Sequence, residues 1–268
     1  MKRREHDIFQ SACIFLTLLT ILFIGGNIAV IAFRGIRSLP ECLHQSETLF
    51  AIYLSIKSAC ISSILCFLLS IAVSYVLTKT RLFCREIIEI LLELTMSLPN
   101  IVLGLSMLIL FSSPLGKALK SAGLPVVFNS SGIVLAQLVV NLPFAVKLTS
   151  TAFRGVDQKL ERVAGLLGAT QGKCFLTILL PLCKNSLISA FILVWSRALG
   201  EFGATLMLVG VTRMKTETLP ASIYLDVSTN NLGGALASAF ILLLISAVSL
   251  GIANHLAKAN RKLSRYEA

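Results

Sequence analysis

The chain has 268 residues, of which 56% are hydrophobic and only 14% are charged, and its mean hydropathy is +0.85. Because a soluble domain typically carries about 25% charged residues, this composition excludes an ordinary soluble domain and indicates a protein that lies in lipid. The net charge of +11 does not indicate a nucleic-acid partner, since the basic residues form short clusters between long apolar runs.

Six apolar stretches are long enough to cross the hydrocarbon core as helices, which takes about 20 residues each. They cover residues 8–33, 50–78, 94–116, 124–153, 187–210 and 232–257. The first is too long for the core of a signal peptide and has no small-residue cleavage site, so we expect it to be retained. The sequence therefore predicts an all-α membrane protein with about six transmembrane helices in one domain over residues 1–268.

Lys and Arg are distributed unequally between the two sides of these spans. With the N-terminus inside, the cytoplasmic segments hold 15 of them and the outside segments hold six. Because cytoplasmic loops carry an excess of Lys and Arg, we expect both termini in the cytoplasm.

The longest inside connection, residues 154–184, contains a short amphipathic helix. Asp157 is a candidate N-cap, and Glu161 follows near the positive end of the helix dipole. Gly168 is expected to end the helix, since a residue without Cβ readily takes positive φ. Pro181 is expected to mark the entry to the fifth span. A short helix on the inside, held between two spans, is suited to docking a soluble partner.

This loop resembles the EAA loop of ABC importer permeases, a Glu-Ala-Ala-type helix followed by Gly and a hydrophobic-x-Leu-Pro ending. In that family the loop forms a coupling helix that sits in a cleft of the ATPase subunit. Arg162 and Val163 depart from the pattern, because they stand where the family has Glu and the first Ala, while Glu161 lies one position early. By this resemblance the residues expected to couple the chain to an ATPase are Glu161, Arg162, Ala164, Gly165, Gly168, Ala169, Ile178, Leu180 and Pro181.

A second resemblance narrows the family. The stretch RALGEFGATLMLVG at 197–210, followed by TETLP at 216–220, looks like the fifth span of molybdate and tungstate permeases and, more loosely, of sulfate permeases. Segments 54–57 and 135–157 resemble the same group, so the similarity covers roughly residues 50–257. It implies a type I ABC importer fold in which two copies form the pore, cytoplasmic ATPase subunits hold ATP and Mg²⁺, and an extracytoplasmic binding protein delivers the oxyanion.

Charged and helix-breaking residues inside the spans are candidates for the transport pathway or its gate. Arg197 and Glu201 are four residues apart, which on a helix would put them on one face; they form either an ion pair that fixes packing or a gate. Gly200 and Gly203 would permit close helix approach. The full set of pathway or gate candidates is Lys57, Pro99, Asn100, Asn141, Arg197, Gly200, Glu201, Gly203 and Thr205.

Several of these residues also have ordinary explanations. Lys57 either attracts an oxyanion or extends its amine to the outer headgroups, and Lys147 has the same alternatives at the inner side. Pro99 and Asn100, like Asn141 near Pro143, either bend helices around a pathway or serve helix packing.

The sequence also indicates what the chain does not do by itself. Residues 165–174 (GLLGATQGKC) resemble a phosphate-binding loop but have Leu167 where that loop needs Gly and Cys174 where it needs Ser or Thr. We therefore expect no ATP hydrolysis, no bound cofactor and, from the scattered Cys and His residues, no metal site. The predicted function is an oxyanion importer permease in the plasma (inner) membrane of a prokaryote. The alternatives are a sulfate or thiosulfate permease and an ion-gradient-driven secondary transporter, which usually needs more intramembrane acids than Glu201 alone.

Overall fold

The computed structural model describes residues 2–80 and 82–266 and gives side chains for 9–80, 82–114 and 116–256; within these ranges it contains helices and turns but no strand. In chain order the helices are α1 (Lys2–Leu43), α2 (Ser46–Lys79), α3 (Arg85–Ser97), α4 (Asn100–Ser112), α5 (Pro114–Ser121), α6 (Ser130–Arg154), α7 (Gln158–Leu166), α8 (Gln171–Cys174), α9 (Leu180–Leu199), α10 (Gly203–Val209), α11 (Leu219–Ser228) and α12 (Leu232–Tyr266). A π-helical stretch, Phe175–Leu179, joins α8 to α9 without a break.

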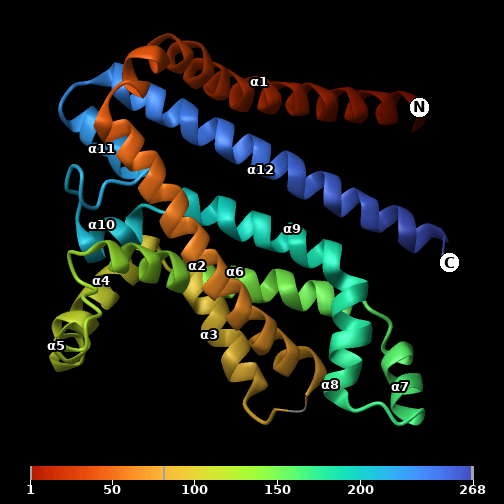
Figure 1. Ribbon diagram of the computed structural model, residues 1–268. Coiled ribbons are helices and arrows are strands. Elements are labelled where there is room, and N and C mark those ends of the chain that lie inside the picture. The colour runs from red at the N-terminus through yellow and green to blue at the C-terminus, as the bar shows by residue number, and fades with distance from the viewer. Residues whose placement is uncertain (1, 81, 267–268) are drawn as a thin grey trace.

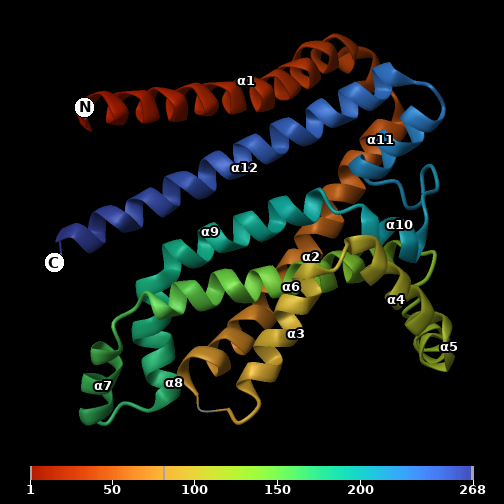
Figure 2. The ribbon, with the colours of Figure 1, turned by 180° about the vertical axis from the view of Figure 1, so that it is seen from behind.

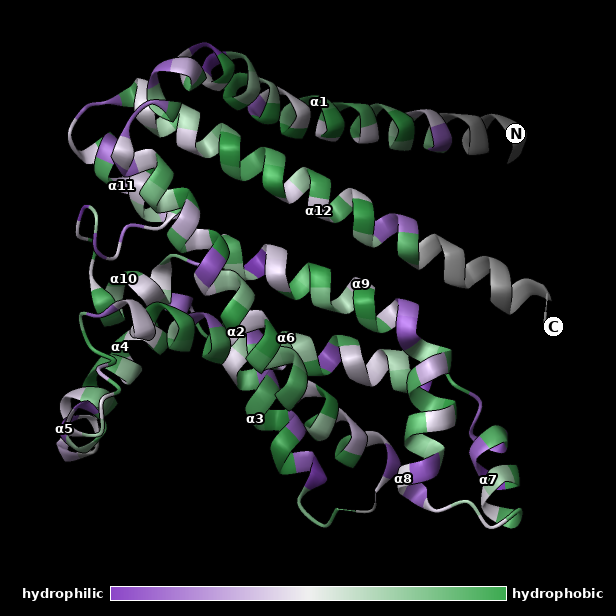
Figure 3. Ribbon diagram, in the orientation of Figure 1, coloured by the Kyte–Doolittle hydropathy of each residue, from purple (hydrophilic) through white to green (hydrophobic). Residues whose placement is uncertain are grey.

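Long apolar helices make up most of this structure, and hydrophobic residues cover α1, α2 and α12 along most of their described length (Figure 3). Five continuous helices are long and apolar enough to cross a membrane: Phe9–Leu43, Ser46–Lys79, Ser130–Arg154, Gln171–Leu199 and Leu232–Leu256. The bent pair α3–α4 supplies a sixth span if its two helices are taken together. The expected all-α architecture with about six spans is confirmed.

Two predicted spans have different bounds in the structure. The first helix does not stop near residue 33 but continues to Leu43, passing through Pro40. The predicted fourth span at 124–153 starts as a helix only at Ser130, because Asn129 accepts a hydrogen bond from a backbone N–H of the first turn and caps the helix there. The helix then continues unbroken through Pro143.

The predicted third span, residues 94–116, is not one helix. α3 ends at Ser97, α4 begins at Asn100, and the two helices are bent by 110°. Pro99 lies in the break, where it has no N–H to donate and disfavours helical backbone at the residue before it. Leu98 accordingly has an extended backbone with ψ of 141°.

The predicted fifth span, residues 187–210, is wrong at both ends. The helical span begins at Gln171 and runs through Pro181. The π-helical stretch directly before this proline is a wider turn than an α-helical one and accommodates its ring and missing N–H. At the other end, α9 stops at Leu199 and the short α10 begins at Gly203. Pro181 therefore does not mark the start of the span.

The centre of the bundle is the packing of α2 on α6, which is more extensive than any other helix pair in the described residues. Gln137 of α6 is 1% exposed and connects three helices. Its amide oxygen accepts from Ser62 at 3.0 Å, and its amide nitrogen donates to Ser58 and to the Ala198 carbonyl of α9. Small residues let helices approach closely in membranes, and the buried serines of α2 are Ser55, Ser58, Ser62, Ser63, Ser70 and Ser74.

The remaining helices pack around this centre. α9 contacts α6 and α2, α12 contacts α9, and α1 lies against α12 at the edge of the molecule (Figure 1). Both described chain ends lie at the same end of the bundle as α7 and α8, while α4, α5, α10 and α11 lie at the opposite end (Figures 1 and 2). The Lys and Arg residues near the two termini, which were counted to predict the orientation, are among the residues whose side chains are not described.

Candidate functional site

The connection between α6 and α8 carries α7, and local hydrogen bonds fix both of its ends. Asp157 caps the helix by accepting a bond from the backbone N–H two residues later at 2.9 Å. At the other end Gly168 has φ of +85°. Its N–H donates to the Gly165 carbonyl and that of Ala169 to the Ala164 carbonyl, both at 3.0 Å. This pair of bonds is a Schellman motif, so the predicted cap and the predicted Gly stop are confirmed.

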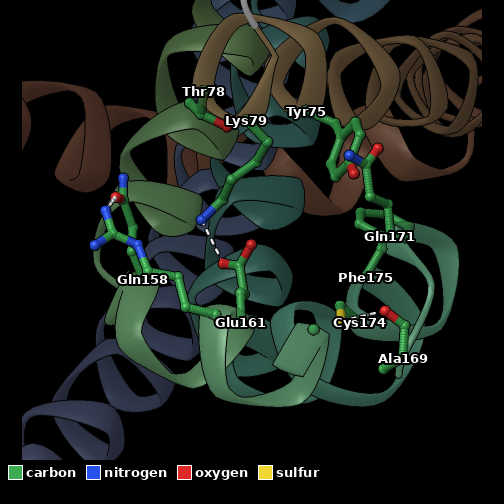
Figure 4. Close-up of a pocket in the computed structure, with 11 residues that line it drawn as sticks. Tyr75, Thr78, Lys79, Gln158, Glu161, Ala169, Gln171, Cys174 and Phe175 are labelled. Atoms are coloured by element: carbon green, nitrogen blue, oxygen red, sulfur yellow. Dashed lines mark hydrogen bonds and ion pairs between the residues drawn. The ribbon is translucent and has the colours of Figure 1, made fainter. Parts of the chain in front are cut away.

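An ion pair joins α7 to the end of α2. Lys79, the last residue of α2, places its Nζ 2.5 Å from Glu161 Oε1, and the two side chains are only 9% and 23% exposed. The pair lies in a pocket of about 290 Å³ between α2, α7 and α8 (Figure 4). The lining residues are Tyr75, Thr78, Lys79, Gln158, Glu161, Arg162, Gly165, Ala169, Gln171, Cys174 and Phe175. This ion pair therefore connects α7 to the last residue of α2.

The outer face of α7 carries exposed apolar side chains that no other described part of the chain covers. Val163, Leu166 and Leu167 are 55%, 88% and 83% exposed. Arg162 is also exposed, and among the described residues its guanidinium donates only to the Gln158 side chain, at 3.5 Å. Clustered exposed apolar side chains mark interaction surfaces, and here the available charge beside them is positive.

The other predicted coupling residues are further along the chain. Ile178 is half-buried in the π-helical stretch, Leu180 packs on a buried cluster that includes Phe153, and Pro181 is exposed on α9. They belong to the fifth span and not to α7, so the structure does not bring them together with the predicted coupling residues from Glu161 to Ala169.

A second site lies where the third and fifth spans are broken. Glu201 is 5% exposed. Its Oε2 accepts from Asn100 Nδ2 at 2.7 Å, and its Oε1 accepts from the Ala204 N–H at 2.9 Å. Asn100 opens α4 directly after Pro99, and Ala204 lies in the first turn of α10. One carboxylate therefore connects the two helix starts; we call this group the Glu201 junction.

The predicted helical pairing of Arg197 with Glu201 is wrong, because α9 ends between them. Arg197 is exposed in the last turn of α9, with its guanidinium 5.0 Å from the centre of the Phe144 ring. Across the described residues it makes no ion pair. Gly200 is the C-cap residue of α9, so the two residues are not on one helix face, and their charges interact without a direct ion pair.

The two glycines of this region differ in their surroundings. A Cβ on Gly200 would meet nothing closer than 3.8 Å, so the close approach predicted there is wrong. A Cβ on Gly203 would lie 3.3 Å from Asn100 Cβ, as predicted for a helix contact. Gly104, which the sequence reasoning missed, is tighter, since its Cβ would lie 2.6 Å from the Ala204 carbonyl oxygen.

The three remaining pathway candidates are dispersed. Lys57 is exposed on α2 with its amine 5.4 Å from the centre of the Tyr53 ring. Asn141 is buried in α6, where its Nδ2 donates to the Gln137 carbonyl at 2.7 Å. Thr205 is 1% exposed, and its hydroxyl has no hydrogen-bond partner in the described residues.

A further group missed by the sequence reasoning connects the segments at the end opposite α7. Arg213 contacts Glu47 at 3.0 Å, Glu217 at 2.8 Å and Asp226 at 2.6 Å. Burial lowers the pKa of Arg213, but the hydrogen bond to Asp226 and the three carboxylate charges outweigh it and raise the pKa above its usual value. Only the Arg213–Glu217 spacing of four residues is a local signal; the other two partners become neighbours only in the fold.

Comparisons with known proteins agree with this architecture. Residues 68–262 match the family model described as "Binding-protein-dependent transport system inner membrane component". The molybdenum transport system permease protein ModB of Mycobacterium tuberculosis is 34% identical over 75% of this chain and 77% of its own length. The molybdate/tungstate transport system permease protein WtpB of Thermococcus kodakarensis is 30% identical over 76% and 79%.

Among solved structures, a chain of a bacterial alginate ABC transporter, in complex with an alginate pentasaccharide-bound periplasmic protein, has the same fold. It superposes with a TM-score of 0.77, at 15% sequence identity, over 96% of both chains.

Proposed function

The chain belongs to the family of binding-protein-dependent transport system inner membrane components, and we propose that it is the permease subunit of an ABC importer for molybdate or tungstate. It is a multi-pass membrane protein and a transport component. The relatives named for molybdenum, molybdate or tungstate transport support the cargo. Sulfate remains the competing tetrahedral dianion.

The observation that carries the proposal is α7. Its ends are fixed by the Asp157 cap and the Gly168 stop, its outer face is apolar and uncovered, and it is joined to α2 by Lys79 and Glu161. A rigid helix with these properties transmits force: a partner that moves α7 also moves α2. Since α2 packs on α6, the movement extends into the centre of the bundle.

In the proposed mechanism two copies of the chain form the pore, and an ATPase subunit docks on each α7. ATP binding draws the two α7 helices together and hydrolysis lets them part, so that the pathway opens alternately outward and inward. ATP and Mg²⁺ are held by the ATPase subunits, and this chain has no ATPase site of its own. In this arrangement α7 and both termini are cytoplasmic, and the membrane is the plasma membrane of a prokaryote.

The opposite end of the bundle faces the extracytoplasmic binding protein. There Arg213 holds the α10–α11 connection to the start of α2 through Glu47 and to α11 through Asp226. Such a network gives the delivery protein a fixed surface to dock on. The identity of the oxyanion is tested by titrating the cognate binding protein with molybdate, tungstate and sulfate and by competition for uptake.

The docking role of α7 is tested by replacing Gly168 with Ala. Positive φ costs a residue with a Cβ about 1–2 kcal/mol, so we expect capture of the ATPase subunit to fall about tenfold. The matched control is Gly165→Ala, because Gly165 lies inside α7 with nothing within 4 Å of an added Cβ. Capture is measured by co-purification in detergent, with size-exclusion profiles as the check on folding.

Two results would contradict the proposal. Equal capture by the Gly168 and Gly165 variants would remove the role of the Gly168 stop in docking. ATP-independent uptake of molybdate by this chain alone would exclude an ATP-driven importer.

A further inference from the structure

Exposed cations lie in a line along one side of the bundle. On α6, Phe144, Lys147, Thr151 and Arg154 recur at spacings of three or four residues, which puts them on one helix face. Lys147, Thr151 and Arg154 are exposed. Arg197 of α9 extends the line away from α7, since its guanidinium lies over the Phe144 ring.

The line runs from the middle of the membrane span to its α7 end. α6 covers Ser130–Arg154, and with a rise of 1.5 Å per residue Phe144 is about 15 Å from Arg154 along the helix. Arg197 is therefore near the midpoint of the span, Lys147 is about one turn lower and Arg154 is at the end.

Arg197 and Lys147, the two charges of this line farthest from α7, have no carboxylate in direct contact among the described residues. Both oxygens of Glu201, the nearest candidate on the sequence, accept from Asn100 and Ala204, so its charge attracts Arg197 only without direct contact. Arg154 shares Glu89 of α3 with Arg85, at 3.6 Å and 3.1 Å.

Exposed cations at membrane depth without a direct ion-pair partner do not face lipid, because the cost of burying each in hydrocarbon is several kcal/mol. A long Lys side chain can extend its amine to the headgroups, and Lys57 fits that description: its neighbours on the surface of α2 are exposed apolar residues such as Ile56, Ile61 and Ile64. Arg197 differs from Lys57 because two further exposed cations, Lys147 and Arg154, continue its line along α6. This face of α6 and α9 therefore borders water or a partner subunit.

We propose that Arg197, Lys147 and Arg154 form a cationic track along which the oxyanion passes from the middle of the membrane to the side of α7. The inference rests on the proposed function and assigns residues to its pathway. Successive sites of moderate strength suit passage, because an ion must bind well enough to enter and weakly enough to leave. Arg197 presents a planar guanidinium that can donate two hydrogen bonds to one oxyanion, and Lys147 presents a point charge that passes the ion on.

The track is tested in proteoliposomes that contain this chain, the ATPase subunit and the binding protein, with radiolabelled molybdate as the probe. For Arg197→Gln and Lys147→Gln we expect uptake per assembled complex to fall about tenfold or more, equivalent to about 1.4 kcal/mol. Lys147→Arg keeps the charge and should stay within about twofold of the unmodified protein. The matched control is Lys57→Gln, which removes the same charge from a span outside the track and should also retain uptake.

Co-purification of the ATPase subunit with each variant separates a pathway defect from failed assembly. Unchanged uptake in both Gln variants, or an equal loss in Lys57→Gln, would overturn the track while leaving the importer intact. Absence of ATP-driven molybdate uptake by the unmodified complex would overturn both the proposed function and the track. A loss in the two track variants, with normal ATPase capture and with activity restored by Lys147→Arg, supports the assignment.

Discussion

The α7 loop is fixed by hydrogen bonds between residues close in sequence, whereas the Glu201 junction is fixed by bonds between segments far apart in sequence. Both ends of α7 are fixed by bonds between residues no more than five positions apart, from Asp157 to Ala169. Glu201 connects a residue at the start of α4 to the start of α10, across 101 positions of sequence from Asn100. α7 exposes its apolar face, whereas the junction is buried. Substitutions at α7 should therefore act on partner docking, and substitutions at the junction on the stability of the fold.

The largest effect is expected from Glu201→Ala, because it leaves a buried donor, the Ala204 N–H, and a partly buried one, Asn100 Nδ2, without their acceptor. Each unsatisfied buried group costs about 1–3 kcal/mol, so we expect a loss of about 3 kcal/mol in the free energy of unfolding, measured by SDS titration of the purified protein. Glu201→Gln keeps one oxygen and should lose less. An unchanged free energy in Glu201→Ala would show that the junction does not hold the broken spans together.

A smaller loss of unfolding free energy is expected from Gly104→Ala, which lies near the Glu201 junction. A Cβ at Gly104 would lie 2.6 Å from a backbone oxygen of α10. The nearest heavy atom to an added Cβ would be 3.3 Å away at Gly203 and 3.8 Å away at Gly200. Overpacking costs about 1–3 kcal/mol, so the loss in unfolding free energy should decrease in the order Gly104→Ala, Gly203→Ala, Gly200→Ala. A different order would mean that α4 and α10 shift apart at little cost.

The smallest change in stability is expected at the ion pair between α7 and α2. Lys79→Gln or Glu161→Gln should cost about 1 kcal/mol of unfolding free energy, because the pair is partly exposed to solvent. Its larger consequence should be weaker coupling of ATP hydrolysis to molybdate uptake, measured in proteoliposomes as molybdate transported per ATP.

The double variant with Lys79→Glu and Glu161→Lys sharpens this test, since it restores the ion pair with the positions of the acid and the base exchanged. Recovery of coupling in the double variant would assign the effect to the pair. If the single variants couple normally, α7 acts on the bundle by another route.

The residues differ in how far local sequence determined their structure. Asp157 and Gly168 were predicted as cap and stop because the bonds that define them are local. Arg197 and Glu201 were assigned to one helix because their spacing fits helical geometry, but α9 ends at Leu199 and Glu201 accepts a tertiary hydrogen bond from Asn100. Pro99 was recognised as a breaking residue, yet its 110° bend depends on what α4 packs against.

The amino-acid sequence by itself determined the solvent, the approximate number of spans and the helix in the inner loop, because hydropathy, charge bias and capping act over short stretches of chain. Only the tertiary structure decided where the third and fifth spans break, which carboxylate joins them, and that Lys79 reaches Glu161. It also decided that Arg197, Lys147 and Arg154 lie along one side, because that line combines a face of α6 with the end of α9. The physical reason is the same in each case: a buried polar group takes the partner that packing brings to it, whatever the separation along the chain.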